Sequence, residues 1–372
     1  MTANVQPLEI LEDLLKRAKA KGAEAADCLI VRDVERNVAH DQAIRRLGKP
    51  EKLERSEAQD LGLRVFIGKR QAIVSTSDLE PKTLDELAER AVAMARVVPE
   101  DEFCGLADPA LLVKTPVALD LEDKTEPSET QLTEMIAKAE DAARAVPGVT
   151  NSEGAEAGWG RVEIALAASN GFRGGYAISR WGISVSVLAG EGTGMERDYD
   201  FASAVFGESL PDPAALGKSA GERTVRRLNP RKASTAKVPI VYDPRVANGL
   251  IGHFVGAING ASIARGTSFL KDKMGQQVFA RGIRIIDDPH RPRGLRSKPF
   301  DGEGVANKKR ALIEDGVLTT WLLDSRSARQ LGLTTTGHAS RGTSSPPSPS
   351  AANLYLEPGK VTPAELMPMP IS

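Results

Sequence analysis

With 372 residues, of which 41% are hydrophobic and 27% charged, the chain has an ordinary globular composition and is long enough for two or three domains. Its formal net charge of -1 provides no field that would hold nucleic acid or an anionic membrane, so direct nucleic-acid binding is not expected. No apolar run approaches the ~18 residues of a membrane span, and the first twenty residues carry acidic groups unlike a signal peptide. A cytoplasmic protein is therefore expected, with its two cysteines, Cys28 and Cys104, in the reduced state.

Residues 1–98 are expected to form an α+β unit, because apolar residues recur first at helical spacing, then at strand spacing, then again at helical spacing. The polar stretch over 32–60 is harder to assign: residues 35–38 fit a strand, and 49–57 are expected to form an exposed connection. The other predicted elements are a helix ending at Gly22, a strand over 27–31, a hairpin turning at 68–70 and a helix over 82–97.

A linker rich in Pro and Asp, residues 99–127, separates this unit from a central helix-plus-hairpin unit over 128–230. Ser128 is followed three residues later by a glutamine, a capping box that predicts the start of a helix. Asn170-Gly171 is the strongest turn dipeptide in the chain, because both residue types tolerate positive φ. The other predicted elements are strands over 161–168, 175–181, 182–189 and 196–206 and a helix over 213–228.

The third unit, residues 237–372, is expected to be β-rich. It opens with a predicted strand over 238–242 that leads into a helix, because Asp243 is a natural N-cap and Pro244 suits the first helical position. The helix should present one apolar face, formed by Val246, Leu250, Phe254, Ala257 and Ile258. Short strand-like runs follow over 283–286, 311–323 and 353–356.

The histidines are dispersed and carry no metal-binding spacing. They are His40, His253, His290 and His338, and none belongs to an HExxH motif. His253 lies at the edge of the apolar helix face, where it is either a zinc ligand or cavity residue or a hydrogen-bonded residue of the helix edge. Its neighbour Phe254 supplies no acid or base, which favours the second interpretation.

Four loops carry functional residue types without a specific motif. The glycines of 190–194 lack the rest of a phosphate-binding loop and predict a turn. The basic run 290–298 lacks interleaved aromatic residues, so a solvated loop or a wall of a substrate cavity is favoured over a nucleic-acid contact. Residues 265–268 and 337–342 are small and polar, and they suit either a grip on a peptide backbone or ordinary turns.

Taken together, several short motifs resemble the PmbA/TldE side of the TldD/PmbA family, in order and over nearly the whole chain. The motifs are Gly62–Lys69, Ser169–Phe172, Val241–Pro244, His253–Ile258, Arg265–Phe269, Asp287–Pro289 and Phe300–Gly304. The resemblance implies a cytosolic subunit, in a family first named for modulation of DNA gyrase. It implies pairing with a TldD subunit in a zinc metallopeptidase complex that acts on unfolded or small peptides.

The chain departs from the active family pattern at the helix that should carry HExxxH. His253 matches the first histidine, but Phe254 stands in place of the catalytic glutamate, and Ile258, or Asn259 after a shift of one residue, in place of the second histidine. No catalytic residue and no metal ligand is therefore assigned to this chain, and zinc is expected in the partner subunit. The family's glycine-rich C-terminal part has no counterpart before Ser372, which predicts a shortened form with an incomplete third unit.

The leading hypothesis is a non-catalytic subunit that completes the peptide chamber of a TldD-type peptidase. The residues expected at the substrate cavity are His253, Asn259, Arg265, Thr267, His338 and Arg341. The alternative is a binding protein that modulates DNA gyrase or a toxin-antitoxin partner and has no peptidase activity.

Overall fold

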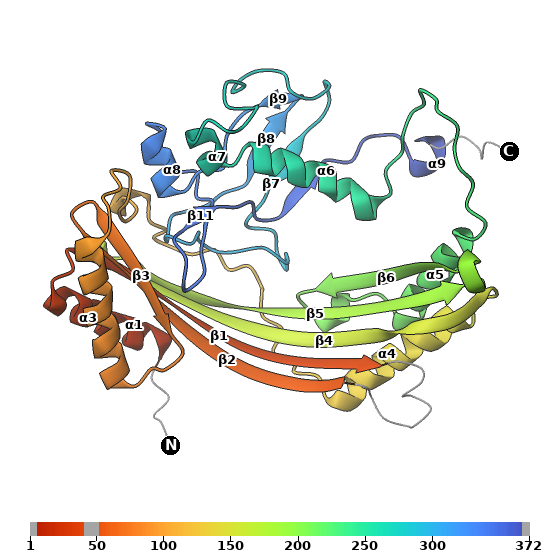
Figure 1. Cartoon of the computed structure of the whole chain (residues 1–372), viewed down its shortest axis with the longest axis horizontal. Helices are drawn as coiled ribbons and strands as arrows, with labels where there is room; N and C mark the ends of the chain where they lie inside the picture. Colours follow the sequence, from red (N-terminus) through yellow and green to blue (C-terminus); the bar gives the residue numbers. More distant parts are fainter. Residues whose placement is uncertain (1–5, 41–51, 367–372) are drawn as a thin grey trace.

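A six-stranded antiparallel sheet organises the computed structural model, which describes residues 6–40 and 52–366 (Figure 1). The strand order is β3-β2-β1-β4-β5-β6. The strands are β1 (Ala25–His40), β2 (Lys52–Ile67), β3 (Arg70–Thr76), β4 (Val149–Ala168), β5 (Arg173–Ala189) and β6 (Glu196–Ala204). Their long, curved ribbons run side by side beneath the C-terminal unit.

Strand β1 joins the first two predicted units. On one side it pairs with β2, from Ala25 opposite Phe66 onward, and on the other with β4, from Asp27 opposite Ala168 onward. Residues 1–98 and 128–230 therefore contribute three strands each to one sheet. The irregular segment 99–127 runs between them with a single short 3-10 turn, Pro109–Leu111, as its regular structure.

Four helices cover one face of this sheet in two pairs. The helices are α1 (Pro7–Lys21) and α3 (Pro81–Val97) at the β3 end, and α4 (Glu129–Arg144) and α5 (Pro213–Arg226) at the β6 end (Figure 1). Alternate strand residues point to this face because side chains in a strand alternate with a period of two. They form two buried clusters with the helices, one around Ile30 and Leu63 and the other around Trp159 and Val185.

Local sequence signals located most of these elements correctly. Ser128 and Gln131 form the predicted capping box, with Gln131 N–H donating to Ser128 Oγ over 3.2 Å, and α4 begins there. Asn170-Gly171 turns the β4–β5 hairpin, with Gly171 at φ 98°, and β2 and β3 form the predicted hairpin. Cys28 and Cys104 are buried free thiols. The α+β fold class is confirmed.

Three predictions about strands were wrong. Residues 52–57 are not a connection but the first part of β2; residues 49–51 lie outside the described chain. The runs 175–181 and 182–189 form one continuous strand, β5, because Gly182 stays extended in the ladder opposite Gly158. Residues 238–242 form no strand, and their apolar side chains are exposed, Ile240 by 70%.

The C-terminal unit lies over the other face of the sheet. Its four-stranded sheet has the order β12-β7-β8-β9, and β10 pairs with β11. The elements are α6 (Pro244–Ala257), α7 (Gly260–Ala264), β7 (Ile285–Asp287), β8 (Arg310–Glu314), β9 (Val317–Leu318), α8 (Ser325–Gln330), β10 (Ala339–Ser340), β11 (Ser348–Pro349), β12 (Leu354–Leu356) and α9 (Pro363–Leu366). Long irregular connections join these short elements. Residues 367–372, the end of the third predicted unit, lie outside the described residues.

Helix α6 begins as predicted, but only half of its apolar face is buried. Asp243 caps it by accepting a hydrogen bond from Arg245 N–H over 2.9 Å. Phe254 and Ala257 are buried in the core of the C-terminal unit, whereas Val246 and Leu250 are 59% and 49% exposed. The periodicity was correct, and the difference arises because only the last turns of the helix reach that core. In the described chain, no helix is long and apolar enough to cross a membrane.

Candidate functional site

The helix position that resembles HExxxH is occupied by core side chains. Phe254 packs edge-on against Phe279, with ring centroids 5.3 Å apart at 83°, and Ile258 is completely buried. His253 points away from this core and is exposed. Neither Phe254 nor Ile258 has an atom that can bind a metal. Over residues 6–40 and 52–366, no group of three or more His, Cys, Asp or Glu side chains is placed to hold a metal ion, so these residues do not fit a zinc site.

Three of the predicted cavity residues shape a turn after α6. Asn259 caps α7 by accepting from Ala261 N–H over 3.0 Å, and its Nδ2 donates to Pro349 O over 2.8 Å. Arg265 and Thr267 are exposed. Arg265 donates a hydrogen bond to the Ser262 hydroxyl over 3.4 Å, and Thr267 donates one to the Ser262 carbonyl over 3.2 Å. These contacts hold the local backbone.

The other two predicted cavity residues are buried polar anchors. His338 Nε2 lies 3.2 Å from Asp287 Oδ2, and its Nδ1 lies 2.7 Å from Thr336 Oγ1. The side chain of Arg341 is 1% exposed and forms an ion pair with Asp27. The structure forms a cleft between the sheet and the C-terminal unit, and none of the six residues predicted for the substrate cavity lines it.

The anchor at Asp27 joins the C-terminal unit to the sheet. Arg64 of β2 donates through Nε to Asp27 Oδ2 over 3.0 Å, and Arg341 reaches the same carboxylate from the loop after β10. Burial alone would raise the pKa of Asp27, but the guanidinium groups of Arg341 and Arg64 hold it below its ordinary value. Nearby, a β-carbon on Gly62 would overlap the backbone of Thr343, so this loop lies directly on β2.

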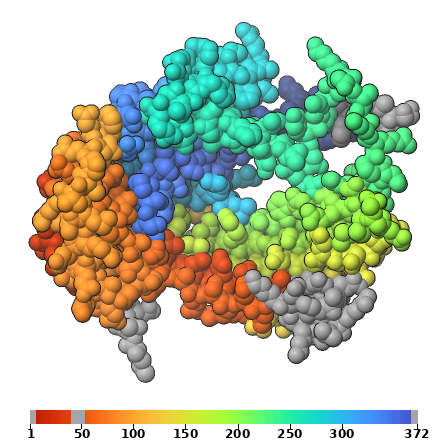
Figure 2. Space-filling model, in the orientation of Figure 1, coloured from red at the N-terminus to blue at the C-terminus, as the bar shows by residue number. Residues whose placement is uncertain are grey.

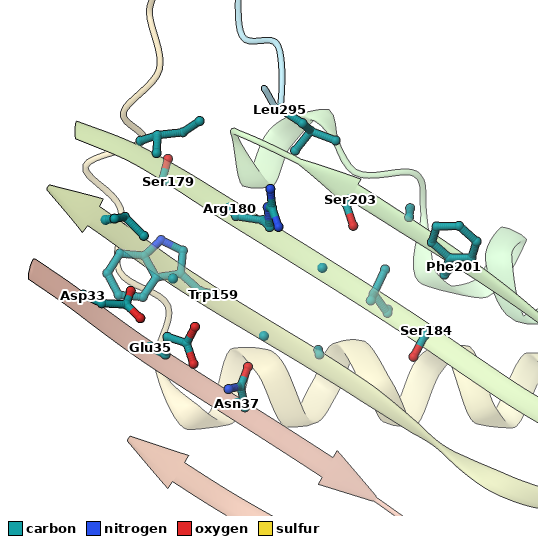
Figure 3. A pocket seen from close by; sticks show the side chains of 18 of the residues that line it. Asp33, Glu35, Asn37, Trp159, Ser179, Arg180, Ser184, Phe201, Ser203 and Leu295 are labelled. Carbon is teal, nitrogen blue, oxygen red and sulfur yellow. The ribbon is translucent and has the colours of Figure 1, made fainter. Parts of the chain in front are cut away.

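A cleft of about 930 Å³ lies between the sheet and the C-terminal unit. Figure 2 shows the hollow between the sheet strands and the chain above them. Its floor is the sheet face opposite the four helices, and its roof includes residues 295–298 and two serines, Ser340 and Ser350. The floor side chains drawn in Figure 3 come from β1, β4, β5 and β6, which lie next to one another in the sheet.

The floor carries charged groups at its sides and glycines along its middle. In strand register, Glu35 of β1 lies opposite Gly160 of β4, which lies opposite Arg180 of β5. In the next row on the same face, Asn37 lies opposite Gly158, which lies opposite Gly182.

The two sides of the cleft differ in charge. Burial, together with the neighbouring Glu35 carboxylate, raises the pKa of Asp33 on the β1 side. On the roof, Arg296 donates to Ser350 Oγ over 3.2 Å, and Lys298 Nζ donates to Ala339 O over 3.1 Å. Burial lowers the pKa of Lys298. An acidic wall on β1 thus faces cations on β5 and the roof, an arrangement that can bind and orient a ligand with separated opposite charges.

One wall of this cleft agrees with the sequence prediction, because residues 295–298 of the basic run 290–298 line its roof. The floor was not predicted, although the sequence carried a signal for it. Along β1, polar Asp33, Glu35 and Asn37 share one face, and the other face carries Val34 and Val38 with Arg36 between them. This is largely the pattern of a strand with one buried face and one polar face. The glycines two residues apart at 158 and 160 repeat that period. What the pattern could not show is that the C-terminal unit roofs the polar face.

Three family models match this chain in consecutive segments. Those described as PmbA/TldA metallopeptidase domain 1, central domain and C-terminal domain match residues 42–95, 116–228 and 235–369. The chain is 39% identical over 295 residues to the metalloprotease PmbA of Escherichia coli O157:H7. That alignment covers 79% of this chain and 66% of the relative, so the match spans just under two thirds of the relative's length.

Solved structures show the same fold. TldE from Thermococcus kodakarensis superposes with a TM-score of 0.85 at 20% identity, over 96% of this chain and 79% of that one. A protein from Bacteroides thetaiotaomicron named as a modulator of DNA gyrase gives 0.85 at 24% identity, over 96% and 78%. With the three domain models matching in order and the PmbA sequence similarity, the chain belongs to the PmbA/TldD metallopeptidase family.

Proposed function

We propose that this chain is a non-catalytic subunit that pairs with a TldD-type zinc metallopeptidase and presents a cleft for its peptide substrates. The observation that carries the proposal is the burial of Phe254 and Ile258 in the core at the helix position where the active family pattern requires a glutamate and a histidine. A helix face committed to packing cannot also carry metal ligands.

The family's chemistry would then be divided between two chains. Zinc held by the partner supplies the activated water. The residues of this chain bind and orient the peptide, and the cleft supports that role because it combines a polar floor with charged groups on two sides. Restoring a glutamate at position 254 of this chain would destabilise the fold, because its charge would lie against Phe279 inside an apolar cluster.

A reconstitution experiment tests this proposal. The purified chain is mixed with a TldD-type partner and zinc, complex formation is measured by analytical ultracentrifugation, and cleavage of an unstructured peptide is followed by mass spectrometry. We expect a complex in which cleavage is faster than with the partner alone. If the chain neither binds the partner nor changes its cleavage rate, the proposal is wrong.

Metal analysis provides an independent test. The chain alone, after equilibration with zinc and desalting, is expected to carry far less than one zinc per chain, because within the described residues His253 belongs to no group of three or more side chains placed to hold a metal ion. One zinc per chain that is lost in the His253→Ala variant would overturn the non-catalytic assignment. A salt-sensitive complex with DNA gyrase formed without any TldD-type partner would instead favour the gyrase-modulator alternative.

A further inference from the structure

Two glycines in the cleft floor are not required by the fold. Gly160 and Gly182 lie inside β4 and β5, and neither has the left-handed backbone that favours glycine. A β-carbon on Gly160 would lie 3.5 Å from Glu35 Cγ, and one on Gly182 would lie 3.9 Å from Ser203 Oγ; both are ordinary contact distances. Gly158, by contrast, is explained by packing, because a β-carbon there would overlap the Asn37 side chain.

Glycine weakens the interior of a strand, and it often marks a place where a ligand or another backbone approaches closely. Among the described residues, none fills the space above Gly160 and Gly182, which both line the cleft. Strands β4 and β5 are each paired with a neighbouring strand on both sides, so their backbone hydrogen-bonding groups are already used within the sheet. A ligand here would therefore lie on the face of the sheet and would not extend it as an added strand.

Arg180 stands beside this bare floor with its charge unmatched. It is exposed, it rises from β5 toward Leu295 in Figure 3, and no ion pair or hydrogen bond of its side chain is present among the described residues. Other arginines of the sheet are paired: Arg161 donates to Glu122 over 2.7 Å and Arg197 to Glu153 over 3.3 Å. An unpaired guanidinium in a cleft suits a carboxylate, which it can bind through two parallel hydrogen bonds.

Opposite charges therefore mark the ends of one row across the sheet. Glu35 and Arg180 are separated by β4, where the residue between them is Gly160. Two inter-strand spacings amount to about 10 Å, which is roughly the length of three extended residues. Beside Glu35, Asp33 adds a second carboxyl on the same face, and Arg296 and Lys298 add positive charge to the roof.

We propose that this row binds a short zwitterionic peptide of about three residues lying across the strands, with its terminal carboxylate on Arg180 and its ammonium group on Glu35 and Asp33. This inference rests on the proposed peptide-handling function and names the ligand class of that cleft. Gly160 leaves room for the peptide backbone against the floor of this row, and Gly182 leaves room beside it in the next row.

Calorimetric titration of the full chain with trialanine tests the proposal. We expect saturable binding that weakens at least tenfold when the peptide C-terminus is amidated, and at least tenfold when its N-terminus is acetylated. Arg180→Met should weaken binding of free trialanine to the affinity of the amidated peptide, and it should leave binding of the amidated peptide unchanged. Glu35→Gln should weaken binding of free trialanine to the affinity of the acetylated peptide, and it should leave binding of the acetylated peptide unchanged. Arg90→Met, at an exposed arginine of α3 outside the cleft, is the matched control and should bind as the parent does.

A glycine variant tests the steric part. Gly160→Val should retain or raise the melting temperature, because a β-carbon there meets only ordinary contact distances, and it should abolish trialanine binding because its side chain would stand between Glu35 and Arg180. Equal affinity for free and amidated peptides, or an unchanged affinity in Arg180→Met, would overturn the inference, as would tight binding by Gly160→Val. A doubly capped peptide with an internal glutamate that binds as well as trialanine would show that Arg180 selects acidic side chains and not the terminus. Should the chain still bind and activate a TldD-type partner in any of these cases, the proposed function stands and only this inference falls.

Discussion

Glu303 is predicted to make the stability of the fold depend on pH. Its side chain is buried beneath the contact between the C-terminal unit and the sheet, where its Oε2 accepts from Ser325 N–H over 2.8 Å. Its Oε1 is 4.0 Å from the guanidinium of Arg64, whose closest acidic partner is Asp27. Burial, together with the nearby Asp301 carboxylate, raises the pKa of Glu303 to about 7. The neutral carboxyl therefore fits this site better than the carboxylate.

The sign and size of the effect follow from proton binding. Between the ordinary pKa of 4.5 and about 7, the folded chain holds a proton on Glu303 that the unfolded chain has released, so stability is lost as the pH rises through this window. At about 1.36 kcal/mol per pH unit over roughly 2.5 units, the loss is on the order of 3 kcal/mol.

The substitution Glu303→Gln mimics the neutral carboxyl and should remove this dependence. Urea unfolding at pH 5, 6, 7 and 8 would compare the variant with the parent, and the variant should gain on the order of 3 kcal/mol relative to the parent from pH 5 to pH 8. Glu89→Gln, at an exposed residue of α3, should change by less than about 0.5 kcal/mol over the same range. A flat difference for Glu303→Gln, or a gain toward low pH, would refute the reasoning.

Three further tests, two of them with a second substitution for comparison, probe stability by urea unfolding. Phe254→Ala should cost about 3–5 kcal/mol because it empties a core position, while Leu250→Ala on the exposed half of the same helix should cost less than about 1 kcal/mol; similar costs would contradict the burial pattern of α6. Asp27→Ala should cost about 3–5 kcal/mol because it leaves two buried guanidinium groups without their carboxylate, and a loss below about 1 kcal/mol would mean that the anchor is not needed. Ser128→Ala should cost about 1 kcal/mol through loss of the capping box, and Ser128→Asp should restore most of it.

Local chemistry in the sequence determined where several elements begin and turn. Ser128 and Asp243 cap helices with their own side chains, and Asn170-Gly171 turns a hairpin, because each of these features depends on residues within a few positions of one another. The sequence alone also shows that positions 254 and 258 supply no metal ligand, because phenylalanine and isoleucine side chains have no metal-binding atom. The α+β class followed from the alternation of these local patterns.

Only the tertiary structure decided how those elements combine. The pairing of β1 with β4 joins residues more than a hundred positions apart, and many other registers would satisfy the same alternation of polar and apolar residues. His338 and Arg341 were predicted to line a cavity because a loop of small polar residues can either grip a peptide or form an ordinary turn. The structure buries both side chains against carboxylates from distant strands, Asp287 and Asp27. The cleft likewise exists only where the C-terminal unit covers a polar sheet face, so its residues acquire a common role through long-range packing that no local pattern encodes.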